Sequence, residues 1–157
     1  MQTQTATTAT DNAVVNALST VLADSYALFG QTHVAHWNVE GKSFFSLHNA
    51  FEEQYNDLFT AIDDIAERIR ALDSLAPGGL ATLAKMSDIE ELAIEPMPAN
   101  DYVAHLIEGH EIATKHLKKL RDVSEEQSDM ETQDMAIARI QVHEKTTWML
   151  KSFIKNL

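Results

Sequence analysis

The chain has 157 residues, which is enough for one domain that buries a core without disulfides or a structural metal. It contains no cysteine, which excludes thiol catalysis, disulfide bonds, iron–sulfur ligation and cysteine-based zinc sites. Acidic residues number 24 against 12 basic ones, so a surface with a formal charge of −12 is expected to repel phosphate backbones and anionic lipid and to attract cations.

The N-terminal stretch MQTQTATTATDNA lacks the charged start and the continuous apolar segment of a signal peptide. No apolar run in the sequence approaches the length that spans a membrane. We therefore expect a soluble, cytoplasmic protein with no membrane contact. The Thr-rich residues 1–10 are expected to be a flexible tail, and residues 11–157 to form a single bundle domain.

The first predicted helix runs from about Asp11 to Asn38, and the turn Asn-Val-Glu-Gly at 38–41 closes it. Glycine and proline are scarce, at 5 and 3 residues, and apolar residues recur at helical rather than alternating spacing through nearly the whole chain. One stripe of this helix carries Val15, Leu18, Leu22, Tyr26 and Phe29.

The second predicted helix begins near Ser43, a residue type suited to an N-cap, and is broken by Pro77-Gly78-Gly79. Its apolar residues follow one another at spacings of three and four: Phe44, Leu47, Phe51, Tyr55, Leu58, Ile62, Ile65, Ile69 and Leu72. The short turn before it makes the first two helices an antiparallel hairpin.

A long connection to Asn100 follows, and it is expected to contain a short helix around Leu80–Met86. The third helix is predicted over Asp101 to about Val123, and the fourth over Asp129 to near Lys155. Ser128 and Glu131 fit a capping box for the fourth helix. The pattern predicts an all-α fold, namely a ferritin-like four-helix bundle with a long crossover between helices two and three that contains a short helix.

A second, polar stripe flanks the apolar stripe of the second helix. At about 100° per residue, His48, Glu52, Asp63 and Glu67 fall within an arc of about 100°. A charged face is usually only solvated, and Asp64 with Arg68 fits that interpretation as an i,i+4 pair. Asp63 and Glu67 do not fit it, since like charges at this spacing cost about 0.2–0.5 kcal/mol. A cation bound near these two carboxylates would offset their repulsion.

One chain cannot place all four side chains on one metal ion. His48 and Glu67 are nineteen residues apart, or about 28 Å along a helix, whereas metal–ligand bonds are about 2 Å. Two antiparallel helices related by a two-fold axis can do so, because His48–Glu67 and Glu52–Asp63 have the same sum of residue numbers. The same register therefore forms both pairs across the interface, twice per dimer.

His36 ends the first helix just before the hairpin turn and is expected to join the His48 end of this site. Each site would then hold two imidazoles and three carboxylates. Oxygen and imidazole donors without sulfur favour iron or manganese, and zinc also fits.

The segments HWNVEGKSFFSLHNAFEE and DDIAERI resemble the Dps family, the mini-ferritins known as DNA-binding proteins from starved cells, and the resemblance covers roughly residues 11–157. It implies that His36, His48 and Glu52 of one subunit and Asp63 and Glu67 of its two-fold mate are ferroxidase ligands. Many members carry Asp where this chain has Glu52. The resemblance therefore does not determine how far the longer side chain of Glu52 extends toward the metal.

The resemblance also implies an activity. A Dps protein oxidises Fe²⁺, preferentially with hydrogen peroxide, and stores ferric mineral in a shell of twelve subunits, which protects against oxidative damage. Trp37 is either a packed aromatic or an electron donor near the site. By similarity, Glu125 and Asp134 would line a pore for iron; helix capping is the simpler alternative.

Two other functions remain as alternatives, a nucleoid DNA-binding protein and a helical interaction module without metal chemistry. The chain has no Lys or Arg in its first 41 residues, so we expect no strong DNA binding. The basic cluster Lys115, Lys118, Lys119 and Arg121 is expected at a helix C-terminus, where cations are ordinarily stabilising. The remaining histidines, His105, His110, His116 and His143, are expected at surfaces or interfaces.

Overall fold

The structure is a computed structural model that describes residues 12–155, and every regular element in that range is a helix. The helices are α1 (Ala13–Asn38), α2 (Phe44–Ala71), α3 (Leu80–Met86), α4 (Ala99–Glu126) and α5 (Met130–Ile154). The all-α prediction is confirmed, including the short helix in the crossover. The predicted tail, residues 1–10, lies outside the described residues.

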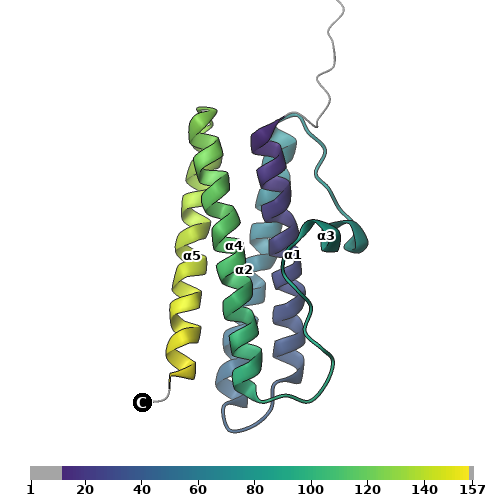
Figure 1. Ribbon diagram of the computed structural model, residues 1–157, viewed down its shortest axis with the longest axis vertical. Helices are drawn as coiled ribbons and strands as arrows, with labels where there is room; N and C mark the ends of the chain where they lie inside the picture. The colour runs from purple at the N-terminus through teal and green to yellow at the C-terminus, as the bar shows by residue number, and fades with distance from the viewer. Residues whose placement is uncertain (1–11, 156–157) are drawn as a thin grey trace, which may run out of the picture.

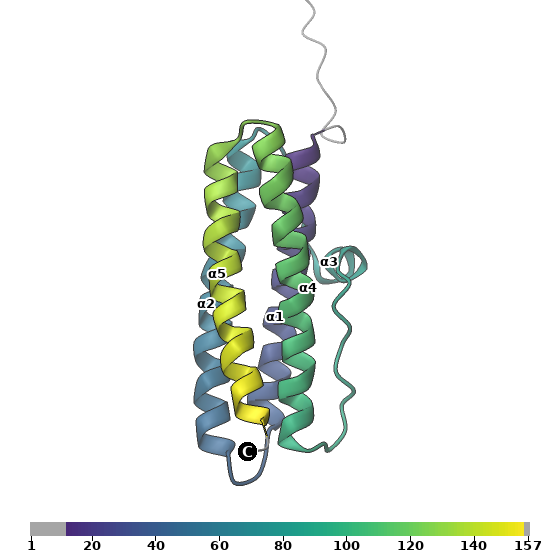
Figure 2. The ribbon, with the colours of Figure 1, turned by 60° about the vertical axis from the view of Figure 1, so that its left-hand side comes forward.

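The four long helices form two antiparallel hairpins, α1–α2 and α4–α5 (Figure 1). The connection from α2 to α4 runs along the length of the bundle and carries α3 on the outside, against α1 (Figures 1 and 2). α1 packs against α2, α3 and α4, while α4 packs along α5. This is the predicted bundle with a long crossover.

Because α1 contacts three other helices, it is the most apolar of the long helices. By length and composition it could cross a membrane, contrary to the expectation from sequence that no segment would reach that length. Half of its apolar window is buried inside the bundle, which is the behaviour of a core helix.

The apolar core consists of two clusters, stacked along the bundle axis. The first lies near the start of α1 and includes Leu18, Leu22, Ile65, Leu117 and Leu120. The second lies near the α1–α2 turn and includes Leu28, Phe51, Leu58, Leu106 and Leu150. The stripes predicted for the first two helices supply residues to both clusters.

α2 ends six residues before Pro77, so the prediction that Pro-Gly-Gly breaks it is wrong. The chain leaves the helix at Asp73, which has a left-handed φ of 60°. The Asp73 and Ser74 amides donate to the carbonyls of Arg70 and Ile69 at 3.0 and 3.3 Å. These bonds satisfy the last carbonyls of the helix, so the chain can turn away before any helix breaker.

α4 ends in the same way, and this overturns the predicted capping box. Ser128 has a φ of 56°, and the Ser128 and Asp129 amides donate to the carbonyls of Glu125 and Ser124. Ser128 therefore closes α4 rather than opening α5. The N-cap of α5 is Asp129, whose carboxylate accepts from the Thr132 amide at 3.0 Å.

Two electrostatic expectations also need correction. α4 continues to Glu126, so the basic cluster from Lys115 to Arg121 lies inside the helix and its last turn has no basic residue. Arg68 does not pair with Asp64; its guanidinium bonds Asp129 at 2.9 Å and Thr132 at 2.9 Å. This contact ties α2 to the start of α5.

Candidate metal centre

His36 and His48 face each other across the α1–α2 hairpin. The Nδ1–H of His36 donates to the backbone carbonyl of His48 at 2.8 Å, and the Nδ1–H of His48 donates to the carbonyl of His36 at 2.8 Å. Their rings stack with centroids 3.7 Å apart. The structure therefore places His36 beside His48, at the start of α2, as the expected site requires.

This reciprocal pair determines the chemistry of the two rings. A carbonyl oxygen only accepts, so each imidazole carries a proton on Nδ1, and in the neutral form of the ring the lone pair is on Nε2. Phe44 stacks against His48, and Tyr55 meets His36 edge-on, with centroids 4.9 and 5.1 Å apart. Two imidazoles held in one orientation by their Nδ1 bonds, with both Nε2 atoms outside those bonds, are suited to bind a metal ion.

The carboxylates of the predicted site lie along α2. Glu52 is one turn beyond His48, and Asp63 and Glu67 lie in the second half of the helix; all three are exposed. Within the described part of one chain, no group of three or more His, Asp or Glu side chains is close enough to hold a metal ion. One chain thus brings together the two histidines but not the distant acids.

Large aromatic side chains are exposed on the same side of the molecule. Phe45 and Phe59 of α2 are 79% and 67% exposed, and Trp37 is 65% exposed. In the single chain Trp37 is therefore not a packed core aromatic; it stacks on His33 with centroids 4.9 Å apart. Exposed apolar groups beside unpartnered acids are typical of a surface that meets another protein chain.

His33 and Tyr55 connect Trp37 with the histidine pair. The His33 ring lies 4.3 Å from the Tyr55 ring, centroid to centroid, and Tyr55 also touches His36. Burial, and secondarily the nearby His36, lowers the pKa of His33, which favours its neutral form. Sequence reasoning placed Tyr55 only in the apolar stripe; its position seven residues after His48 was the available signal.

The two acids assigned to a pore lie at opposite sides of the α4–α5 turn. Glu125 is in the last turn of α4 and Asp134 in the second turn of α5, and both are exposed. Asp129 caps α5, and an acid at a helix C-terminus is unfavourable to the helix dipole. Helix capping therefore explains neither residue.

Two of the four remaining histidines are buried in the core of the single chain, whereas surface or interface positions were expected for all four. His110 and His143 are 3% and 1% exposed, and His105 is half-buried. His116 bonds the buried Asp24 at 2.5 Å and lies 3.3 Å from Asp88. His110 follows Ile107 by three residues and precedes Leu117 by seven, a core spacing that could have identified it.

Known proteins resemble this chain over most of its length. The family model of the ferritin-like domain matches residues 15–157. DNA protection during starvation protein 2 of Bacillus anthracis is 33% identical over 90% of this chain and 96% of its own. Among solved structures, Dps from Staphylococcus aureus is 30% identical, with a TM-score of 0.90 over 94% of this chain and 98% of that one.

Dps from Vibrio cholerae O1 is 31% identical, with a TM-score of 0.86 over 90% of this chain and 89% of that one. Its structure is described as that of a member of a broad superfamily of ferritin-like diiron-carboxylate proteins. The similarity therefore extends over the α1–α2 hairpin that carries the histidine pair.

Proposed function

Because the chain belongs to the Dps family of ferritin-like proteins, we propose that it is a ferroxidase that binds Fe²⁺ between two subunits, oxidises it and stores the ferric product. The observation that carries this proposal is the reciprocal His36–His48 pair, which presents two Nε2 lone pairs beside Glu52. Iron storage in general follows from the family; the assignment of residues is our inference.

In the proposed site, His36, His48 and Glu52 of one subunit meet Asp63 and Glu67 of a second. The carboxylates offset the charge of Fe²⁺ and favour Fe³⁺ still more, while the neutral imidazoles limit the total negative charge. The donor set contains no sulfur, since the chain has no cysteine. Zinc and manganese are expected to compete for the same donors.

Hydrogen peroxide is the proposed oxidant. Two Fe²⁺ ions each give one electron, the O–O bond of one peroxide breaks, and its oxygens leave as hydroxide or water, so no hydroxyl radical is released. Ring contacts through His33 and Tyr55 connect Trp37 with His36. We propose that Trp37 donates the second electron to peroxide when only one Fe²⁺ is present. Glu125 and Asp134 are the proposed acids of an iron pore.

The proposed assembly is a cytoplasmic shell of twelve subunits. The exposed Phe45 and Phe59 of α2 would be covered by the two-fold mate. More exposed apolar side chains lie on α5, including Trp148, Met149 and Phe153, and these would be covered by further subunits. Native mass spectrometry tests the subunit number.

Stopped-flow measurement of Fe²⁺ oxidation by peroxide tests the site. We expect His48→Ala and Asp63→Ala to slow the reaction about a hundredfold or more, because each removes one ligand of the pair of metal positions. Asp64→Ala is the matched control, since Asp64 neighbours Asp63 on α2, projects about 100° further around the helix and is not one of the proposed ligands. Full activity in both site variants, with assembly intact, would reject the assignment.

DNA binding is not part of the proposed function, although relatives carry the name DNA protection during starvation protein. The net charge of −12 opposes a phosphate backbone. A gel-shift titration at about 150 mM salt is expected to show no retarded DNA at micromolar protein, whereas a clear shift would require a basic surface that the charge balance does not provide.

A further inference from the structure

A polar layer separates the two apolar clusters of the bundle. Along α4, His110 lies between Ile107 of the second cluster and Leu117 of the first. Along α5, His143 lies between Ile140 and Leu150 in the same way. The Nδ1 atoms of the two histidines are 2.8 Å apart, so one donates a hydrogen bond to the other inside the core.

The direction of this bond follows from the neighbouring Arg139. Its guanidinium donates two bonds to the Asp57 carboxylate, at 3.1 and 2.9 Å, and one N–H faces Nε2 of His143 at 3.3 Å. Arginine only donates, so His143 is unprotonated on Nε2 and carries its proton on Nδ1. His143 therefore donates to Nδ1 of His110, whose own proton is on Nε2.

Every lone pair of the two rings is thus already accepting a hydrogen bond. An added proton on Nε2 of His143 would face the Arg139 guanidinium, and one on Nδ1 of His110 would face the Nδ1–H of His143. Either proton breaks a bond that holds α5 in place. The Nε2–H of His110 and the Nε of Arg139 are buried without a partner among the described residues, so neither relieves the added charge.

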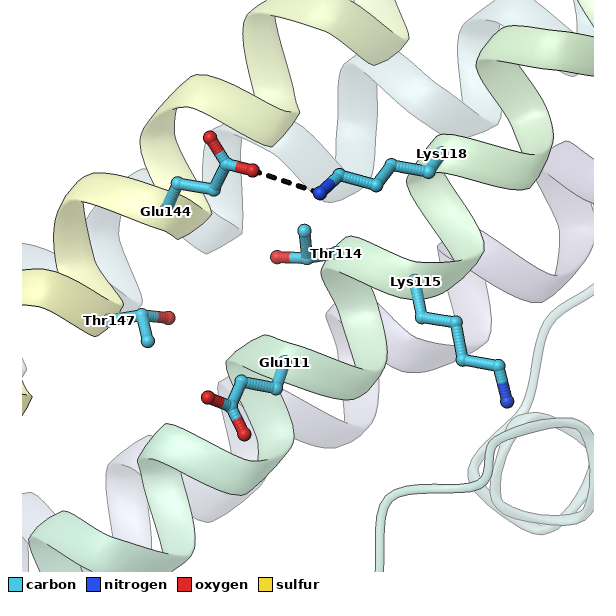
Figure 3. A pocket seen from close by; sticks show the side chains of 6 residues that line it. All are labelled: Glu111, Thr114, Lys115, Lys118, Glu144 and Thr147. Atoms are coloured by element: carbon cyan, nitrogen blue, oxygen red, sulfur yellow. Dashed lines mark ion pairs between the residues drawn. The ribbon is translucent and has the colours of Figure 1, made fainter.

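Among the charged groups around the pair, Asp57 raises the pKa of His110, but burial and the charge of Arg139 outweigh it. From α2, Asp57 is already held by two bonds from Arg139. On α1, the buried Asp24 is engaged by His116. A groove of about 470 Å³ between α4 and α5 is lined by the charged residues Glu111, Lys115, Lys118 and Glu144 and by Thr114 and Thr147 (Figure 3). Glu144 pairs with Lys118 at 3.1 Å, and Glu111 with Lys151.

We propose that the His110–His143 pair is a proton-operated lock, which ties α5 to α4 while both rings are neutral and releases α5 when either ring is protonated. The lock is independent of the metal centre, because it uses no residue of that site. Its bonds also reach α2 through Arg139 and Asp57, so the release affects both helices that α5 faces.

The direction of the pH effect follows from the same geometry. Burial, and then Arg139, lowers the pKa of His110 from its ordinary value of 6.5 to about 4, and burial, His110 and Arg139 lower the pKa of His143 well below 6.5. Above about pH 6.5 both histidines are neutral in the folded chain and in the unfolded chain. Below pH 6.5 these histidines bind protons in the unfolded chain but stay neutral in the folded chain. The folding equilibrium constant therefore falls by up to about tenfold per pH unit for each histidine.

Hydrogen exchange of the iron-free assembly, followed by mass spectrometry on peptides of α5, tests the lock. Between pH 6.5 and 5.5 we expect the opening equilibrium of α5 to rise about five- to thirtyfold after correction for intrinsic exchange. In the double variant His110→Leu/His143→Leu the rise should be below about twofold, while the control His105→Gln should behave as the parent. An equal rise in the double variant overturns the proposal.

A second measurement on the parent protein covers the case in which the double variant does not fold. With ¹⁵N-labelled histidine, the two Nδ1 nuclei should show a scalar coupling through the shared proton at pH 7.5, and it should vanish together with the protection of α5 on acidification. Two ordinary, uncoupled histidine signals that titrate near pH 6.5 would show that the lock does not exist.

Discussion

His36 and His48 show how backbone bonding prepares a side chain for chemistry. Each ring uses one nitrogen to bond the backbone of the other residue, and both bonds are 2.8 Å long. The direction of the remaining nitrogen, Nε2, is therefore fixed by the fold, and in the neutral ring this nitrogen carries the lone pair. Residue types and spacing predicted that the two histidines would lie together, but the tautomers depend on carbonyl positions that only the folded hairpin supplies.

Arg68 is a structural residue in the last turn of α2, and a first prediction concerns its removal. Arg68→Met leaves the Asp129 carboxylate without its cation, so we expect a loss of about 1–3 kcal/mol in the free energy of unfolding. Arg121→Met is the control, because the ion pair of Arg121 is with its exposed neighbour Asp122 on the same helix. Equal midpoints of the two variants in urea denaturation would contradict this role.

The pH dependence of the same contact follows from Asp129. Burial raises its pKa, but the bonds from Thr132 and the charge of Arg68 outweigh this and hold the pKa below its ordinary value of 3.8. A lowered carboxylate pKa stabilises the fold above about pH 4, and this stability is lost as the pH falls through the lower folded value. The Arg68→Met penalty should accordingly shrink in acid below pH 4.

At the scale of elements, the helices follow from local sequence and their ends do not. The spacing of apolar residues located all four long helices, and Leu80–Met86 has the predicted bounds. Both corrected ends are left-handed turns at Asp73 and Ser128, which are not glycine. Sequence offered Pro-Gly-Gly as the stronger signal after α2, but the chain turns away earlier, where the amides of Asp73 and Ser74 bond the last carbonyls of the helix.

The strain at Ser128 gives a second prediction. A left-handed residue with a Cβ costs about 1–2 kcal/mol, of which glycine recovers part after its own entropy loss. Ser128→Gly should therefore stabilise the protein by roughly 0.5–1 kcal/mol, measured as a higher Tm of the metal-free protein. Ser128→Ala keeps the Cβ and should give no gain, and an equal rise in both variants would exclude relief of backbone strain as the cause.

At the scale of the whole molecule, the central question is whether two chains complete one metal site. A mixture of two inactive variants, His48→Ala and Glu67→Ala, tests this directly. In a mixed dimer, one interface site carries both substitutions and the other carries neither. After dissociation and random reassembly, about a quarter of all sites should be intact, and about a quarter of the ferroxidase activity should return.

The control for this mixture is the pair His48→Ala and Glu52→Ala. Both substitutions fall on the part of the site that one subunit supplies, so every site of a mixed dimer keeps one defect and no activity should return. Recovery in this control, or its absence in the first mixture, would mean that the ligands do not divide between subunits as proposed.

The sequence by itself determined the helices, the hairpin that joins His36 to His48, and the acidic stripe of α2, because these depend on periodicity and residue type. The tertiary structure decided the partners of Arg68, the ends of α2 and α4, and the burial of His110 and His143. These depend on contacts between helices distant in the chain, where a long polar side chain can satisfy a neighbour that local spacing does not reveal.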